Sequence, residues 1–150
     1  MGEAFFYHLT ASPVEDTLTM LLGKCLGTGW RVAVRGTRDD TLERLDQRLW
    51  THPPDGFLPH GLAGGPHDSD QPVLLTTQPD LPNAAQCVIS IEGAPVEPDE
   101  VTALARVCIV FDGHDNMALE RARGQWKAIT RAGCGAQYWA QEDGRWRKKA

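Results

Sequence analysis

The sequence lacks the features of a membrane or secreted protein. Its first residues, MGEAFFYHLT, have no charged segment followed by an apolar run, and no stretch approaches the roughly 18 apolar residues of a transmembrane helix. It also lacks an excess of positive charge, because the net charge is −5 and such a molecule repels a phosphate backbone. We therefore expect a cytoplasmic protein that binds neither DNA directly nor a membrane. Any basic function must be confined to a local patch.

Paired metal-ligand motifs are absent too. The cysteines and histidines do not supply spacings such as C-x2-C or H-x3-H, so we expect no metal site. The cysteines are isolated from one another along the sequence and lie mostly within apolar runs, which favours buried, reduced thiols. The four cysteines are Cys25, Cys87, Cys108 and Cys134.

Glycine-rich phosphate loops and catalytic motifs are also missing. The first predicted strand is followed by TASP, and no G-x-G-x-x-G, G-x-x-x-x-G-K-[ST], G-x-S-x-G or H-E-x-x-H pattern occurs. This absence argues against one alternative function, a small α/β enzyme that uses a nucleotide or a sugar phosphate. We expect no catalytic residue and no cofactor.

Strand and helix patterns alternate along most of the chain. With 150 residues, 41% of them apolar, the chain is sized for one domain with a single core. The alternation predicts an α/β domain with a central, mainly parallel sheet flanked by helices. Strands are predicted at residues 4–9, 31–35, 73–76, 87–91 and 107–111, with a last extended piece at 136–139; helices are predicted at 12–27, 37–49, 98–105 and 115–131.

Local signals mark where the elements begin and end. Ser12 can cap the first helix and Pro13 suits its first turn, while Asp115 or Asn116 can cap the last helix. Residues 51–72 are rich in Pro, Gly, His and Asp, which predicts a long surface loop. The basic residues 145–149 follow as a short tail.

One run within this chain is specific to a known family. The sequence LDQRLWTHPPDGFLPHGLAG at residues 45–64 resembles the chi subunit of bacterial DNA polymerase III, an accessory subunit of its clamp loader. Four further segments agree in order: FYHL at 6–9, RVAV at 31–34, QPVLLT at 71–76 and ARGQWKAITRAG at 122–133. The resemblance implies a single chi-like domain over residues 1–150, with a Rossmann-like three-layer fold and no catalytic activity. It also implies a link between the clamp loader, in some lineages through a subunit called psi, and single-stranded-DNA-binding protein.

The resemblance further implies a binding site for the acidic C-terminal tail of single-stranded-DNA-binding protein, which ends in an aromatic residue with a free carboxylate. The family places this site on the last long helix, where a guanidinium can hold a carboxylate through two hydrogen bonds. Leu119 and Asp112 depart from the best-studied branch of the family, which has a lysine and an apolar residue at these positions. The expected tail-binding residues are Arg123, Lys127, Trp50, Leu119 and Trp126.

Plainer alternatives exist for each of these residues. Trp126 at helical spacing suits a core position as well as a ligand pocket, and Arg123 with Lys127 suits a solvated helix face. The apolar segment Phe57, Leu58, Pro59 and His60 suits either a structural turn or a contact with psi or the clamp loader. The sequence does not separate these alternatives.

Overall fold

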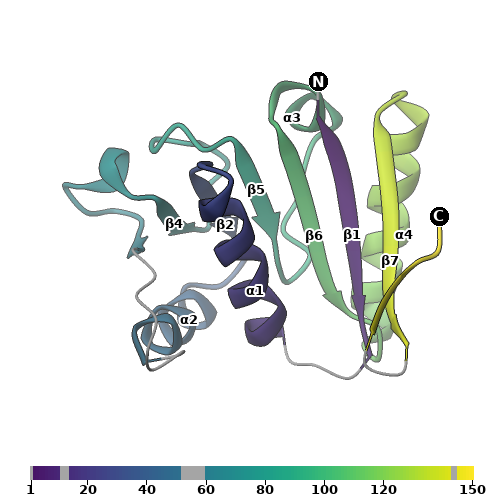
Figure 1. Cartoon of the computed structure of the whole chain (residues 1–150), viewed down its shortest axis with the longest axis horizontal. Helices are drawn as coiled ribbons and strands as arrows, with labels where there is room; N and C mark the ends of the chain where they lie inside the picture. Colours follow the sequence, from purple (N-terminus) through teal and green to yellow (C-terminus); the bar gives the residue numbers. More distant parts are fainter. Residues whose placement is uncertain (1, 11–13, 52–59, 143–144) are drawn as a thin grey trace.

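A single twisted sheet forms the centre of the molecule (Figure 1). The computed structural model describes residues 2–10, 14–51, 60–142 and 145–150, and within them eight strands pair in the order β3-β4-β2-β5-β6-β1-β7-β8. The strands are β1 Glu3–Leu9, β2 Val32–Arg35, β3 Gly61–Leu62, β4 Val73–Thr76, β5 Cys87–Ser90, β6 Arg106–Asp112, β7 Gly135–Glu142 and β8 Arg145–Lys148. The helices are α1 Val14–Gly27, α2 Asp39–Thr51, α3 Pro98–Ala103 and α4 Asn116–Arg131, with a 3-10 turn at Asp68–Asp70.

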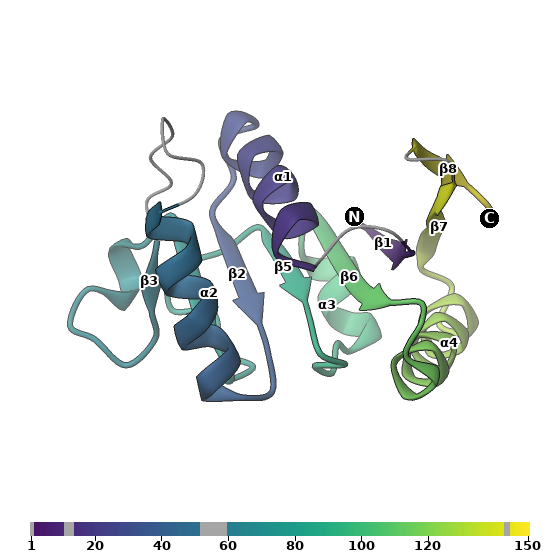
Figure 2. The ribbon, with the colours of Figure 1, turned by 90° about the horizontal axis from the view of Figure 1, so that it is seen from below.

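Helices cover both faces of the sheet, which gives three layers. Figure 2 shows α1 and α2 on one face and α3 and α4 on the other. All strand pairs are parallel except β7 with β8. Strands β2, β4 and β5 are buried along their whole length, as expected for parallel strands enclosed by helices. The predicted Rossmann-like α/β fold with a mainly parallel sheet is confirmed.

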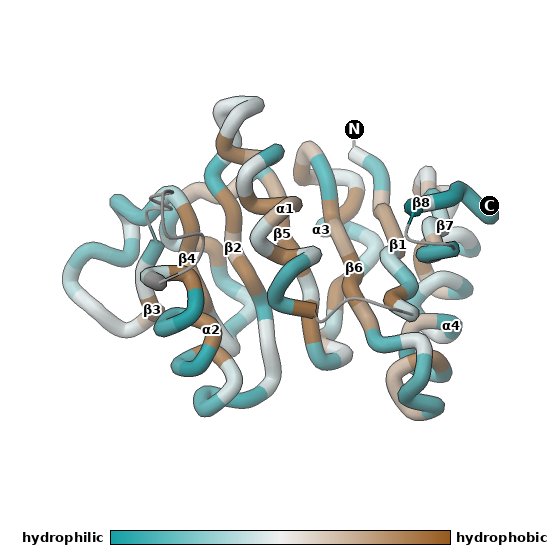
Figure 3. The backbone as a smooth tube through the Cα atoms, turned by 60° about the horizontal axis from the view of Figure 1, so that its bottom comes forward, coloured by the Kyte–Doolittle hydropathy of each residue, from teal (hydrophilic) through white to brown (hydrophobic). Residues whose placement is uncertain are grey.

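The core consists of two main hydrophobic clusters, one on each face of the sheet. Strand β1 contributes to both, since Tyr7 packs toward α1 while Phe6 packs toward α3 and α4. Figure 3 shows the hydrophobic residues concentrated along the central strands, with hydrophilic residues in the surrounding loops. Leu18 and Leu22 of α1 are fully buried, and each contributes roughly 1.5–3 kcal/mol to stability.

Two sequence predictions at the edges of the sheet are wrong. Within the predicted loop 51–72, Gly61–Leu62 forms β3 and pairs with β4, and the predicted tail contains β8, which pairs with β7. Neither strand could show a period-2 apolar pattern in the sequence. Strand β3 has only two residues, and β8 has a single apolar side chain, that of Trp146. The predicted cap Ser12 and the predicted first-turn residue Pro13 lie outside the described residues.

The cysteines are isolated in the sequence but three of them meet in space. Cys25, Cys87 and Cys108 are buried in the cluster beneath α1, whereas Cys134 is half-buried. The sulfur atoms of Cys25 and Cys87 lie 3.8 Å apart, and this hydrogen bond together with burial raises the pKa of Cys25. The prediction of buried thiols is confirmed for these three. In the described part of the chain, no helix is long and apolar enough to cross a membrane.

Candidate functional site

Helix α4 presents a basic surface on a chain that is acidic as a whole. It carries four cations and one carboxylate, that of Glu120. The helix begins at Asn116 because the side chain of Asp115 accepts hydrogen bonds from the backbone N–H groups of Met117 and Ala118. The cations are Arg121, Arg123, Lys127 and Arg131.

Arg123 and Lys127 lie one turn apart on the same side of α4. Both side chains are exposed, and within the described residues neither forms an ion pair. Their spacing of four residues makes them neighbours on the helix surface. The structure therefore brings these two predicted residues together and leaves both charges available to an anionic ligand.

Arg123 borders a cluster of rings that the sequence reasoning did not identify. Burial raises the pKa of Tyr138, and the positive charge of Arg123 offsets part of that rise. Burial also lowers the pKa of His8. The positive charges of His114 and Arg123 lower this pKa further, whereas the negative charge of Asp112 raises it. The Tyr138 hydroxyl lies 2.8 Å from Nδ1 of His8. One feature of the sequence could have indicated this cluster. Side chains alternate between the two faces of a strand, and this alternation places His8 of β1 and Tyr138 of β7 on the same face of the sheet.

Trp126 and Leu119 pack inward beside this cluster. The Trp126 ring is half-buried and lies edge-on to Phe6, with ring centroids 5.2 Å apart, and close to Tyr138 at 5.9 Å. Leu119 is also half-buried against the same hydrophobic cluster. Both residues thus hold α4 against the sheet, which agrees with the core alternative for Trp126.

Trp50 lies on a different part of the molecule. Its side chain is 52% exposed near the end of α2, and its ring centroid is 4.5 Å from that of His60. Helices α2 and α4 lie toward opposite ends of the longest axis in Figures 1 and 2, so the structure does not bring Trp50 beside Arg123.

His60 is the described member of the apolar segment 57–60. It is buried, and its Nε2 lies 3.1 Å from both the backbone oxygen and Oδ1 of Asp46. This contact fixes the residue against α2, which favours the structural alternative for His60. Phe57, Leu58 and Pro59 lie outside the described residues.

A crevice at the carboxyl ends of β5 and β6 connects α2 with the start of α4. Its volume is about 470 Å³, and its lining includes Arg44 and Arg48 of α2, Glu15 of α1, and Asp112 and Asp115 before α4. Open α/β sheets bind ligands at this edge, where the following helices part to opposite faces. Glu92 also lines the crevice, whereas neither Trp50 nor Arg123 does.

The described residues contain no metal-binding arrangement. Nowhere in residues 2–10, 14–51, 60–142 and 145–150 do three or more His, Cys, Asp or Glu side chains group so as to hold a metal ion.

Comparison with known proteins points to one family. A family model described as "DNA polymerase III chi subunit, HolC" matches residues 1–137. The chain is 23% identical over 122 residues to a probable DNA polymerase III subunit chi of Rickettsia prowazekii (strain Madrid E), covering 78% of this chain and 74% of that protein. It is 28% identical over 141 residues to DNA polymerase III subunit chi of Escherichia coli (strain K12), covering 89% and 94%.

Proposed function

This chain belongs to the DNA polymerase III chi subunit family, and we propose that it links the clamp loader to single-stranded-DNA-binding protein by binding that protein's acidic C-terminal tail. As a chi subunit it is an accessory, non-catalytic subunit of DNA polymerase III. The single observation that carries the proposal is the exposed pair Arg123 and Lys127 on α4, without ion-pair partners in the described residues.

The chemistry of the pair suits the end of such a tail. The Arg123 guanidinium is planar and offers two parallel N–H donors to a terminal carboxylate. Lys127 adds a positive charge one turn away, which attracts the acidic residues that precede the terminus. The half-buried Leu119 and Trp126 provide apolar surface next to Arg123 for the terminal aromatic ring.

Asp112 and Leu119 limit the strength of this site. A carboxylate at residue 112, at the end of β6, opposes an acidic ligand, and Leu119 supplies no charge in the first half of α4. We therefore place most of the electrostatic attraction on Arg123 and Lys127. Trp50, which lies apart from these two residues, contributes less than Arg123 in this proposal.

The clamp loader, directly or through psi, is the second partner in this proposal. In this proposal its contact on the chain includes Phe57, Leu58 and Pro59, which precede His60 in the sequence. A pull-down from the source cell, in which clamp-loader subunits and single-stranded-DNA-binding protein are identified together, tests both links.

Substitution of Arg123 tests the tail site directly. Arg123→Ala removes a charge-assisted contact and should weaken binding of the tail peptide by roughly ten- to a hundredfold in isothermal titration. Arg123→Lys should restore part of the affinity, because an ammonium cannot form the planar two-point contact. Lys127→Ala should cost less, and its effect should shrink with added salt.

Arg121→Ala is the matched control on the same helix. Arg121 lies on another side of α4, where its Nη1 is 3.5 Å from the backbone oxygen of Glu92, so its loss should leave the affinity nearly unchanged. Wild-type affinity in Arg123→Ala, or an equal loss in Arg121→Ala, would show that the tail does not bind at Arg123.

A further inference from the structure

A second cavity lies on the face of the sheet that α1 only partly covers. Figure 2 shows β1 and β7 without a helix above them on this side. The cavity has a volume of about 250 Å³ and is bounded by α1 and by strands β1, β6, β7 and β8. We call it the aromatic pocket, after its five aromatic residues: Phe5, Tyr7, Trp30, Trp139 and Trp146.

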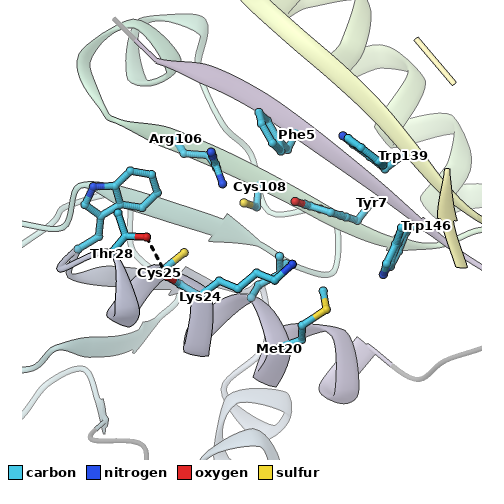
Figure 4. Close-up of a pocket in the computed structure, with 12 residues that line it drawn as sticks. Phe5, Tyr7, Met20, Lys24, Cys25, Thr28, Arg106, Cys108, Trp139 and Trp146 are labelled. Atoms are coloured by element: carbon cyan, nitrogen blue, oxygen red, sulfur yellow. Dashed lines mark hydrogen bonds between the residues drawn. The ribbon is translucent and has the colours of Figure 1, made fainter. Parts of the chain in front are cut away.

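The charged side chains that line the aromatic pocket are both positive. They are Lys24 of α1 and Arg106 of β6, and neither forms an ion pair within the described ranges. The Arg106 guanidinium lies 4.2 Å from the centroid of Phe5 and 5.3 Å from that of Trp30. Figure 4 shows the two cations reaching the pocket from different elements, with the rings of β1, β7 and β8 beside them. The lining therefore suits a ligand that is both planar and anionic.

Tyr7 adds a polar group inside the pocket. Its ring lies edge-on to Trp146, with centroids 5.3 Å apart, and Figure 4 shows its hydroxyl directed into the pocket. Burial raises the pKa of Tyr7, so the hydroxyl stays protonated. Among the described residues, none forms a hydrogen bond with that hydroxyl, which leaves it available to a polar edge of the ligand.

Positive charge continues from the pocket along β8. Residues 145–149 contain four cations, and two of them, Arg147 and Lys149, form ion pairs with Glu142. Residues 106–150 carry nine Lys and Arg against five Asp and Glu, a net charge of +4, whereas residues 1–105 carry six against fifteen, a net charge of −9. A chain of net charge −5 can attract an anion only through a local basic patch. Residues 145–149 form such a patch, and Trp146 lies within it.

We propose that the aromatic pocket binds an unpaired base of single-stranded nucleic acid. The base stacks on the pocket rings, Lys24 and Arg106 hold the adjacent phosphates, and β8 attracts the phosphates that follow. Aromatic rings beside cations suit the alternating bases and phosphates of a single strand, because the rings stack on bases while the cations attract phosphates. The proposal rests on the pocket alone and is independent of tail binding at Arg123.

Fluorescence anisotropy with a labelled oligothymidine of about 15 nucleotides tests the proposal. At about 50 mM NaCl the full chain should bind it with a Kd of roughly 10⁻⁴ to 10⁻⁶ M, and an abasic strand of equal length should bind at least roughly fivefold more weakly. Trp146→Ala should lower the affinity at least roughly fivefold, and Trp146→Phe should restore part of it.

A pair of charge reversals separates the pocket from non-specific attraction. Lys24→Glu should reduce both the affinity for the oligothymidine and the dependence of that affinity on salt concentration. Arg38→Glu, just before α2, makes the same change of charge and should affect neither. Equal binding of the abasic strand, or no effect of either Trp146 substitution, would overturn the proposal. A loss of oligonucleotide affinity in Arg123→Ala but not in Lys24→Glu would also overturn it. So would quenching of the fluorescence of the pocket tryptophans by an acidic peptide but not by the oligonucleotide.

Discussion

A buried ion pair joins the centre of the sheet to α3. The side chain of Arg35 is 3% exposed and that of Glu100 is 23% exposed, and two hydrogen bonds of 2.9 and 2.8 Å connect them. Burial by itself raises the pKa of Glu100, but the hydrogen bonds and charge of Arg35, with the backbone N–H of Glu97, hold it below its ordinary value. The pair therefore fixes α3 only while the carboxylate is ionised.

Glu100→Gln should lower the free energy of unfolding by roughly 3 kcal/mol at neutral pH, because it leaves the Arg35 charge buried and unpaired. Since the folded pKa is lowered, the wild-type contribution is full above the unfolded pKa of about 4.3 and is lost as pH falls through the folded pKa. Urea unfolding at pH 7 and below pH 4 should show the gap between the two proteins narrowing in acid. Asp40→Asn, in the exposed pair with Arg38, is the control and should change stability little. A gap that stays constant with pH would contradict the role of the ion pair.

Helix α4 depends for stability on Asp115, the residue that caps its N-terminus. Asp115 accepts hydrogen bonds from Met117 and Ala118 at 3.0 and 3.3 Å, and its charge lies at the positive end of the helix. Asp115→Ala should therefore cost about 1 kcal/mol of stability, and Asp115→Asn should recover most of it, because asparagine also caps well. Thermal unfolding of the three proteins measures both effects. Equal stability of Asp115→Ala and wild type would show that the cap contributes nothing.

The elements with long apolar patterns were predictable, and those defined by their neighbours were not. The Leu42, Leu45 and Leu49 spacing and the Asp115 cap mark α2 and α4 in the sequence itself. Strands β3 and β8 exist because β4 and β7 offer free edges, which a local pattern cannot reveal. The same limit applies to the candidate site. Arg123 and Lys127 meet through helix periodicity, whereas the position of Trp50 depends on how α2 packs.

On the scale of the whole molecule, charge is divided between two parts of the chain. Residues 1–105 have a net charge of −9 and residues 106–150 one of +4. The positive part contains α4 and β8, so an acidic partner is attracted to these elements and repelled by the opposite end of the sheet. We expect association with an acidic peptide to slow as salt is added, while the dissociation rate changes less.

The most direct test of the proposed function compares two peptides on the wild-type chain. Both carry the acidic tail sequence of single-stranded-DNA-binding protein, one with a free terminal carboxylate and one amidated. Because Arg123 is proposed to hold that carboxylate, isothermal titration should give an affinity at least roughly tenfold higher for the free acid. Equal affinities would contradict carboxylate recognition by α4, and no binding of either peptide would contradict the proposed link to single-stranded-DNA-binding protein.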